Sequence, residues 1–254
     1  MQRRIAVVIA ALDEAADIEE VYERLRRALL ALPDTRSEFI WVVEGTDGTA
    51  AILRRLAQAD GAPPSTFIEP RVRRGLGAAF RLGFAAVPES ADVVITMDAD
   101  LNHEPEELKR LLDAFETERA DIAIGSRKVP GGEIRSMDAW RRWSSDSVNW
   151  LLGRLFHSPV RDASSGYRIY RASALRRLRF ENDGYAFQWE IVLLALASRM
   201  RVIEVPITFT QRRQGQSKLY LAETIRSYLR LCSRHLLQQN GRGGAGPPFN
   251  APKP

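Results

Sequence analysis

The first half of the chain alternates short apolar runs with segments in which apolar residues recur at helical spacing. The apolar runs cover residues 5–10, 39–43, 66–68, 93–97 and 122–124. Continuous apolar runs are typical of strands that are buried on both faces of a sheet. Between the first two runs, Ile18, Val21, Leu25 and Leu29 share one face of a predicted helix. The alternation predicts an α/β fold with a mostly parallel sheet flanked by helices, in which ligands bind beyond the carboxyl ends of the strands.

The second half is less regular, and its elements are predicted one at a time. We expect a helix over 138–156, a short strand over 167–170, an apolar helix over 188–198, a strand over 202–209 and a final helix over 221–238. Residues 1–240 are predicted to form a single domain, of which 218–240 is a C-terminal amphipathic helix. The Gly/Pro-rich stretch 241–254 has too few apolar residues to bury a core and is predicted to be disordered.

Charge and composition narrow the classes of function. The net charge of +5 suits nucleic acid, a membrane surface or phosphorylated substrates. A nucleic-acid binder would gather its basic residues on one recognition element with stacking aromatics, whereas here they are scattered over several loops. A single cysteine, Cys232, excludes an intramolecular disulfide and fits a reducing compartment. No apolar stretch approaches the roughly 20 residues of a membrane span, and no signal peptide is visible, so we expect a soluble or peripheral protein.

Two aspartates follow the fourth predicted strand, in the segment MDADLNHEPEEL. Asp98 and Asp100, one residue apart at a strand end, can converge on a hard divalent cation, and Asn102 can add an oxygen ligand. Such a cation, Mg²⁺ or Mn²⁺, would neutralise the pyrophosphate of a departing nucleotide diphosphate. The competing interpretation is a capping loop, because Asp and Asn also favour turns and helix starts.

Basic residues gather in three later segments, GSRKVPGG, DAWRRWSSDSVN and TQRRQGQSKL. They offer Arg127, Arg141, Arg212 and Lys218 as phosphate ligands, since an arginine fork can bind two phosphate oxygens at once. Taken one by one, each is more readily explained as a solvated surface charge. Together with a carboxylate pair for a metal, they describe a site for two phosphorylated ligands.

The segment RGLGAAFRLG is rich in glycine but lacks the spacing of the dinucleotide fingerprint. We interpret Gly75 and Gly77 as positions where the backbone lies close to a ligand or to a neighbouring helix.

Taken together, these segments resemble the family 2 glycosyltransferases, which have the GT-A fold, and more closely the dolichol-phosphate (polyprenol-phosphate) mannose synthases. The matching segments run in the family order from about residue 5 to residue 220: VVIAALDE, EGTDGT, RGLGAAFRLG, MDADLNHEPEEL, IGSRKVPGG, RDASSGYRIYR, GYAFQWEI and EVPITFTQRRQGQSKL. The resemblance implies an enzyme that transfers a hexose with inversion, by first expectation mannose from GDP-mannose, to a polyprenyl or dolichyl monophosphate.

The resemblance also implies which residues bind the donor. Asp98, Ala99 and Asp100 would hold the donor and its metal, with Asn102 as a further ligand, and Glu14 would contact the nucleotide. The donor-binding positions at the first two strands are Ala10, Leu12, Val42 and Glu44.

The remaining implied roles concern the phosphates. Arg127 and Arg141 match positions that meet phosphate at the transfer centre, and with Asp100 they are the expected catalytic residues. Arg212 and Lys218 match positions that close over the donor diphosphate, to which Arg127 would also contribute. Three further residues fall in motifs that shape the site without an assigned role: Asp162, Arg168 and Glu190.

Two departures from the family pattern bear on the nucleotide. The family usually opens with Pro-Thr-Tyr-Asn-Glu, where residues 10–14 here are Ala-Ala-Leu-Asp-Glu. The aspartate pair that follows the second strand in the family appears here as Val43 and Glu44, where base and ribose bind. A UDP-sugar donor such as UDP-glucose therefore stays open as an alternative. A non-catalytic module that binds a nucleotide sugar is a second alternative, although Asp98 and Asp100 are both present.

The expected partners are a nucleotide-sugar donor, a lipid phosphate acceptor, a membrane surface and a membrane-anchoring subunit, but no nucleic acid. The expected location is the cytoplasmic face of a membrane. In the final helix, one face carries Leu221, Ile225, Tyr228, Leu229, Cys232 and Leu236, and the opposite face carries Arg226, Arg230 and Arg234. This pattern fits a helix packed on the domain, and it also fits an interfacial helix attracted to anionic lipid.

Overall fold

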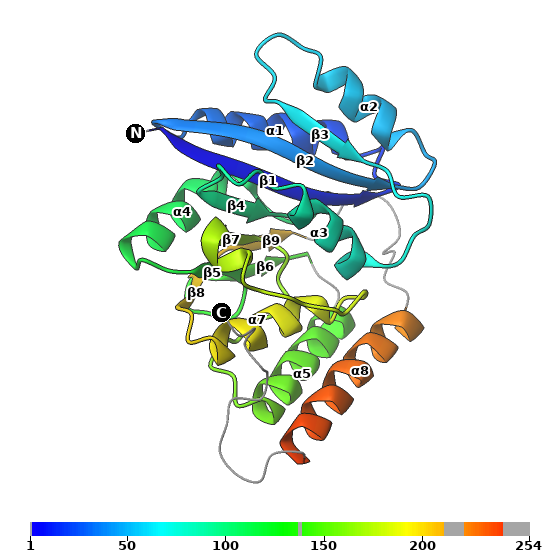
Figure 1. Cartoon of the computed structure of the whole chain (residues 1–254), viewed down its shortest axis with the longest axis vertical. Helices are drawn as coiled ribbons and strands as arrows, with labels where there is room; N and C mark the ends of the chain where they lie inside the picture. The colour runs from blue at the N-terminus through cyan, green and yellow to red at the C-terminus, as the bar shows by residue number, and fades with distance from the viewer. Residues whose placement is uncertain (1, 137–138, 211–220, 241–254) are drawn as a thin grey trace.

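A central sheet with helices on both faces makes up most of the molecule (Figure 1). The computed structural model describes residues 2–136, 139–210 and 221–240, and for residues 139–145, 221–223 and 234–240 it describes the backbone alone. The predicted tail over 241–254 and the start of the predicted C-terminal helix at 218–220 lie outside the described residues. The division into a domain over 1–240 and a disordered tail therefore stays a prediction.

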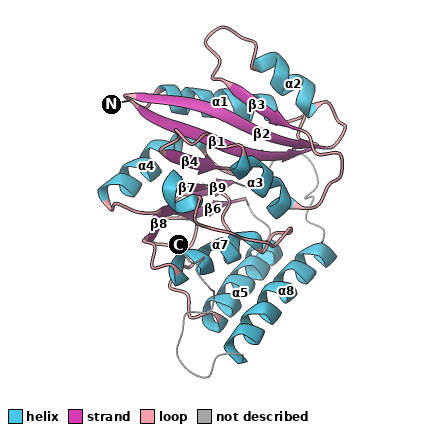
Figure 2. Cartoon of the chain, in the orientation of Figure 1, coloured by secondary structure: helices cyan, strands magenta, loops and turns pink. Residues whose placement is uncertain are grey.

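The sheet has seven strands in the order β3-β2-β1-β4-β7-β5-β8. Figure 2 draws the strands in magenta and the helices in cyan. The strands are β1 (Arg3–Leu12), β2 (Thr35–Glu44), β3 (Ser65–Ile68), β4 (Val93–Thr96), β5 (Ile122–Ser126), β7 (Arg168–Arg171) and β8 (Val202–Pro206). All neighbouring pairs are parallel except those of β7, which runs antiparallel between β4 and β5. The mostly parallel sheet predicted from the apolar runs is confirmed.

Each face of the sheet has its own core. The first packs on α1 (Ile18–Leu30), α2 (Thr49–Leu56) and α4 (Leu108–Thr117), which the short η1 (Pro105–Glu107) directly precedes. The second packs on α3 (Leu76–Ala85), α5 (Ala139–Leu155), α6 (Ala172–Leu175), α7 (Phe187–Ala197) and α8 (Leu221–Asn240). Successive side chains of a strand point to opposite faces, so Ile5, Val7 and Ile9 of β1 enter the first core while Ala6 and Val8 enter the second.

The strand predicted over 202–209 is wrong in its extent, because it is divided into two. β8 ends at Pro206, and β9 (Thr208–Thr210) pairs with β6 (Glu133–Arg135) in a separate two-stranded sheet. Proline has no N–H to donate to a ladder. Ile207, which lies between the two strands, donates its N–H to Ser126 O at 3.0 Å and accepts from Glu133 N at 2.9 Å. The small sheet thereby covers the segment that follows β5.

The helices α5 and α8 agree closely with the helices predicted over 138–156 and 221–238. Figure 1 draws α5, α7 and α8 together at one end of the molecule. Among the described helices, none combines the length and the apolar content that a bilayer crossing requires.

Candidate active site

The carboxyl ends of the parallel strands bring the predicted donor-side residues together. In the register of β1 and β2, Ala10 is paired with Val42 and Leu12 with Glu44. Glu14 follows directly after β1, and the segment with the two aspartates follows β4, which is paired with β1 on its other side. These positions therefore lie at one edge of the sheet, where open α/β sheets bind their ligands.

Asp13, which sequence reasoning did not single out, joins the ends of β1 and β2. Its Oδ1 accepts a hydrogen bond from Thr46 N at 2.9 Å, and its own N–H donates to Glu44 O at 3.2 Å. Gly45 leaves room for this carboxylate, since a Cβ there would lie 1.9 Å from Asp13 Oδ1. The next residue, Glu14, donates its N–H to Thr49 Oγ1 at 2.9 Å. The turn after β1 is thus held rigidly against the turn after β2.

Glu44 ends β2 with a carboxyl that is only 10% exposed. Its Oε2 lies 4.0 Å from Nε of Arg73, in the segment after β3. Burial raises the pKa of the Glu44 carboxyl, while the Arg73 charge lowers it, and the net shift is upward. As a carboxylate, Glu44 can only accept hydrogen bonds, so it suits hydroxyl or N–H groups of a bound nucleotide.

The two aspartates after β4 lie in a tight turn in which Leu101 has a φ of +58°. Asp98 Oδ2 lies 3.1 Å from Nε2 of His103. Asp100 accepts hydrogen bonds from the backbone N of Asn102 at 3.2 Å and from its side-chain Nδ2 at 2.6 Å. Asn102 therefore presents its amide nitrogen to Asp100, and a role as metal ligand would fall to its Oδ1.

Ala99, between the two aspartates, is 4% exposed and packs in the first core. Any contact that it makes with a donor therefore comes from its backbone. Within the described residues, no three His, Cys, Asp or Glu side chains gather around one point as a metal cluster would.

Arg127, which follows β5, is paired with Asp162. Its Nε and one terminal nitrogen donate to the two carboxylate oxygens at 2.7 and 2.6 Å, and its backbone N donates at 3.0 Å. The Asp162 side chain is fully buried, that of Arg127 is 9% exposed, and the guanidinium lies 5.0 Å from the ring centroid of Phe209. Burial would raise the pKa of the Asp162 carboxyl, but the Arg127 charge beside it holds that pKa below its usual range. The phosphate contact predicted for Arg127 stays a prediction, because the contact that the structure describes is with Asp162.

Arg168 and Glu190, whose roles the resemblance left open, hold backbone segments. Arg168 is 1% exposed and donates to three backbone carbonyls within the range 163–188, at 2.6–3.1 Å. Glu190 accepts hydrogen bonds from the backbone N–H groups of residues 181 and 182 at 3.2 and 2.8 Å. Both charged groups therefore fix the loops that flank the site.

The glycine-rich segment lies against other backbone. Gly77 N donates to Asp183 O at 2.7 Å, and a Cβ at Gly75 would lie 2.4 Å from the same oxygen. The backbone does approach another segment closely here, but that segment is the loop 181–186 and not the helix that the sequence interpretation named. The same loop is bound to α8, where Ser227 Oγ donates to Asn182 Oδ1 at 2.6 Å and Ser227 O accepts from Asn182 Nδ2 at 3.0 Å.

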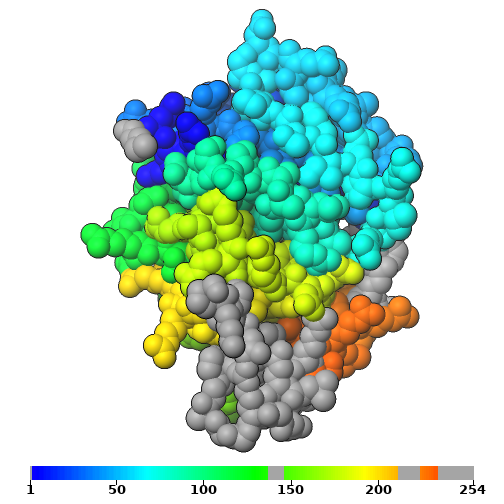
Figure 3. Space-filling model, in the orientation of Figure 1, coloured from blue at the N-terminus to red at the C-terminus, as the bar shows by residue number. Residues whose placement is uncertain are grey.

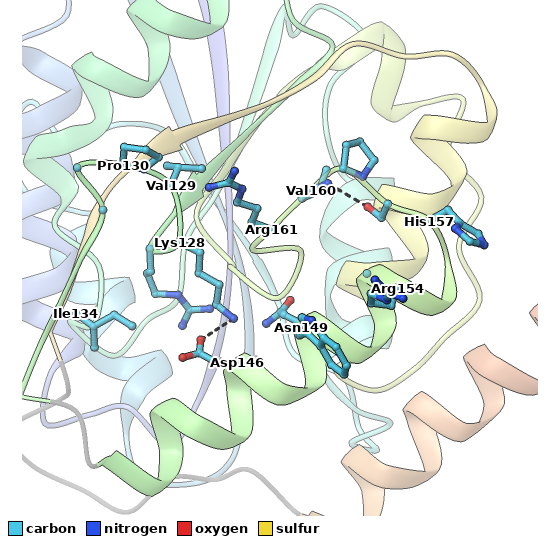
Figure 4. Close-up of a pocket in the computed structure, with 17 residues that line it drawn as sticks. Lys128, Val129, Pro130, Ile134, Asp146, Asn149, Arg154, His157, Val160 and Arg161 are labelled. Atoms are coloured by element: carbon cyan, nitrogen blue, oxygen red, sulfur yellow. Dashed lines mark hydrogen bonds and ion pairs between the residues drawn. The ribbon is translucent and has the colours of Figure 1, made fainter.

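Arg127 forms part of the wall of a cavity of about 1010 Å³. This cavity is shown in Figure 4 with other lining residues labelled, among them Lys128 and Asn149. Its walls come from the segment after β5, from α5 and from residues 157–161. Lys128 and Arg161 contribute positive charge, and Lys128 Nζ lies 3.0 Å from Asp146 Oδ1. The apolar lining comprises Val129, Pro130, Ile134, Trp150, Pro159 and Val160. The cavity therefore offers cationic and apolar surface to the same ligand.

Three predicted phosphate ligands cannot be placed in this geometry. Arg212 and Lys218 fall in the segment 211–220, outside the described residues, and for Arg141 of α5 the structure describes the backbone alone.

Comparisons with known proteins agree with this architecture. The chain is 37% identical over 224 residues to the polyprenol monophosphomannose synthase of Mycolicibacterium smegmatis, an alignment that covers 85% of this chain and 81% of the relative. It is 34% identical over 222 residues to the undecaprenyl-phosphate mannosyltransferase of Micrococcus luteus, covering 85% and 87% of the two chains.

Solved structures show the same fold. Glucosyl-3-phosphoglycerate synthase from Mycobacterium tuberculosis, crystallised with Mn²⁺, UDP-glucose and phosphoglyceric acid, superposes with a TM-score of 0.66 at 24% identity over 91% of this chain and 80% of that one. The GT-A type of α/β fold expected from the sequence is thereby confirmed. The family model for glycosyl transferase family 2 matches residues 6–179, a span that begins within β1, ends beyond β7 and includes both aspartates and the Arg127–Asp162 pair. The chain belongs to glycosyl transferase family 2.

Proposed function

We propose that the chain transfers mannose from GDP-mannose to a polyprenyl monophosphate, with inversion at the sugar carbon. The observation that carries the proposal is the arrangement at one sheet edge: Asp98 and Asp100 follow β4, and the Arg127 segment with its cationic and apolar cavity follows β5. The names of the two relatives, which specify mannose and a polyprenyl or undecaprenyl phosphate, support the same reaction.

The carboxylates of Asp98 and Asp100 suit Mg²⁺ or Mn²⁺ as the cation of the donor diphosphate. Hard divalent cations prefer oxygen ligands, and Mg²⁺ is usually held by one or two carboxylates together with substrate phosphates. Both aspartates are partly exposed and follow the same strand, so they fit this set of oxygen ligands. Such a cation, when bound, neutralises charge on the diphosphate that leaves. Asn102 would orient Asp100 or add its Oδ1 as a ligand.

The nucleotide would bind along the ends of β1 and β2. Glu14 and Glu44 would contact base or ribose, and the backbone of Ala10, Leu12 and Val42 would line the same place. Arg212 and Lys218 would close over the diphosphate, since fixed cations there stabilise the negative charge that develops in the transition state.

The acceptor phosphate would approach from the side of β5 and α5. A phosphate monoester has a second pKa of about 6 and is therefore largely anionic near neutral pH, so no general base is needed to activate its oxygen. The task of the protein is to orient it and to offset repulsion from the donor diphosphate. Arg141 and the cations Lys128 and Arg161 would meet the phosphate, while Arg127 would act through its pair with Asp162 or directly. Apolar walls such as Trp150 would receive the first part of the isoprenoid chain.

A membrane surface is the second partner that we propose. Four large apolar side chains on α5 and α8 are at least half exposed: Trp150, Leu151, Ile225 and Leu229. Arg226 and Arg230 of α8 are exposed as well, and α8 runs along the outside of the molecule (Figure 3, orange). Apolar side chains beside basic ones are typical of helices that lie in a membrane interface. The acceptor lipid would then reach the cavity without leaving the bilayer.

The test is a donor panel. The full chain is incubated with radiolabelled GDP-mannose, UDP-glucose or UDP-N-acetylglucosamine, Mg²⁺ or Mn²⁺, and a polyprenyl phosphate in detergent, and the label in the lipid phase is counted. We expect label from GDP-mannose and none in chelator. Binding of a nucleotide sugar without any lipid-linked product would instead identify a non-catalytic module.

The UDP-sugar alternative rests on one observation. Glu44 stands where the family carries an aspartate pair, and its buried carboxyl lies beside Arg73. A longer side chain reaches a different edge of the base, so the base can differ from guanine. Lipid-linked label from UDP-glucose alone would decide in favour of this alternative.

A further inference from the structure

We propose that His103 and Gly166 are positioning residues that hold the Asp98 carboxylate in the orientation in which it binds the donor diphosphate and its cation. The inference rests on the proposed function, in which Asp98 is one of the two carboxylates at the donor. Neither His103 nor Gly166 was singled out by its sequence motif, and neither would touch the substrates.

His103 is fixed before it meets Asp98. It is 2% exposed, and its ring centroid lies 5.5 Å from that of Tyr167 and 5.5 Å from that of Phe209. Its backbone forms an isolated antiparallel bridge with Phe209. From this fixed ring, Nε2 reaches Asp98 Oδ2 at 3.1 Å. A carboxylate accepts hydrogen bonds and does not donate them, so Nε2 carries the proton in this contact.

The other ring nitrogen explains why a histidine here points to function. Among the described residues, Nδ1 of His103 is buried without a hydrogen-bond partner. A buried polar atom without a partner costs free energy, and a leucine could fill the space between Tyr167 and Phe209 without that cost. The bond from Nε2 to Asp98 is therefore the interaction that accounts for an imidazole at this position.

Gly166 supports the same carboxylate from the other side. A Cβ at Gly166 would lie 2.4 Å from Asp98 Oδ1 and 3.0 Å from its Cγ. The backbone of Gly166 is held in place, because its carbonyl accepts a hydrogen bond from the buried Thr96 Oγ1 at 2.8 Å. Its φ lies outside the left-handed region that favours glycine. Space for the Asp98 carboxylate, rather than backbone conformation, is therefore what requires glycine at this position.

Together the two contacts fix the plane of the Asp98 carboxylate. One oxygen is bound by His103 and the other occupies the space that a Cβ at Gly166 would take, while 33% of the Asp98 side chain remains exposed. Partners of this kind, one step removed from a metal, typically change metal affinity or activity 10–100-fold when they are lost. We expect the same here.

The experiment measures Mn²⁺ binding to the full chain in saturating GDP, from the free-Mn²⁺ signal in electron paramagnetic resonance. His103→Leu and Gly166→Ala should each weaken Mn²⁺ binding by about 10–100-fold. His103→Gln, whose Nε2 can donate from a similar position, should lie closer to wild type. Gly153→Ala is the matched control for cation affinity, because the nearest atom to a Cβ there is 4.0 Å away, in Trp189. Thermal unfolding of each variant confirms that it is folded.

The outcomes distinguish failure of the positioning role from failure of the proposed function. Wild-type Mn²⁺ affinity in both His103→Leu and Gly166→Ala would overturn the positioning role while leaving the proposed function intact. An equal loss of Mn²⁺ affinity in His103→Leu and His103→Gln would also contradict the positioning role, because the hydrogen bond from position 103 to Asp98 would then be irrelevant. No Mn²⁺ binding by the wild-type chain with GDP would overturn the proposed donor site, and the inference with it. If His103→Leu fails to fold, Gly166→Ala decides, since only the Asp98 side chain must give way to it.

Discussion

Replacing Asp162 by asparagine removes the negative charge of the buried pair and turns one of its two acceptor oxygens into a donor. In Asp162→Asn, the Arg127 guanidinium, 9% exposed, stays in place without the carboxylate that is hydrogen-bonded to it. Removal of one partner from a buried ion pair costs about 3–5 kcal/mol. Each kcal/mol lowers the Tm of a chain of this size by about 2–4 °C, so we expect a Tm that is lower by roughly 6–20 °C. The loss should appear as a lower urea midpoint with an unchanged m value.

The pair also gives stability a pH dependence of definite sign. Burial raises the pKa of the Asp162 carboxyl, but Arg127 more than offsets this and the folded-state pKa lies below the ordinary value. A lowered folded-state pKa stabilises the native state above the unfolded-state pKa of about 3.9. That stabilisation is lost as the pH falls through the folded-state pKa. The difference in unfolding free energy between wild type and Asp162→Asn should therefore shrink as the pH drops below about 4.

Two further variants test the reasoning. Asp146→Asn breaks the Lys128 pair, in which the Asp146 side chain is 48% exposed, and should cost less than about 1 kcal/mol. The double variant Arg127→Met with Asp162→Asn removes both charges and should recover part of the loss of Asp162→Asn alone. If the unfolding free energy of Asp162→Asn lies within about 1 kcal/mol of the wild-type value, water screens the pair, and its burial does not produce the expected loss of stability.

Four other outcomes follow from the proposed function. Asp100→Asn should abolish transfer and weaken Mn²⁺ binding with an unchanged circular dichroism spectrum; full activity in chelator would contradict this. Calorimetry should give tighter binding of GDP than of UDP, and the opposite order would implicate Glu44. Arg141→Ala should slow transfer by about a hundredfold, with Arg141→Lys recovering only part; unchanged acceptor kinetics would remove this residue from the site. Leu229→Glu should weaken binding to anionic vesicles in sedimentation, whereas equal binding would place the membrane contact elsewhere.

The strands that the sequence predicted best are those that are buried on both faces. The apolar runs at 5–10, 39–43 and 93–97 fall within or over β1, β2 and β4, because a strand between two helix layers must be apolar throughout. The antiparallel direction of β7 could not be predicted, since strand direction depends on pairing with distant β4 and β5. Pro206 is a local signal for the break between β8 and β9. The alternation of apolar residues over 202–209 nevertheless favoured one continuous strand in the prediction.

Some residues of the candidate site could be predicted from the sequence, and others could not. Asp98 and Asp100 could be predicted because ligands bind at the carboxyl ends of parallel strands, and the sequence alone shows that both aspartates follow an apolar strand. The partner of Arg127 could not be found, because Asp162 is 35 residues away and joins it only through the pairing of β5 with its neighbours. His103 lies in the same segment as the two aspartates, but no spacing in the sequence marks it as a partner of Asp98. Its contact with Asp98 depends on the bridge to Phe209, a residue far along the chain.

The loop 181–186 connects two helices that are distant in the sequence, α3 and α8. Its Asn182 is bonded to Ser227 of α8, and the carbonyl of the next residue, Asp183, accepts the N–H of Gly77 in the first turn of α3. Glu190 of α7 holds the same loop at residues 181 and 182, so the loop joins α3, α7 and α8, and ordering of α8 would stabilise the backbone against which α3 begins. The first turn of α3 follows the segment of Arg73, whose charge faces Glu44. Hydrogen-exchange protection acquired at α8 would therefore extend to the nucleotide end of the sheet.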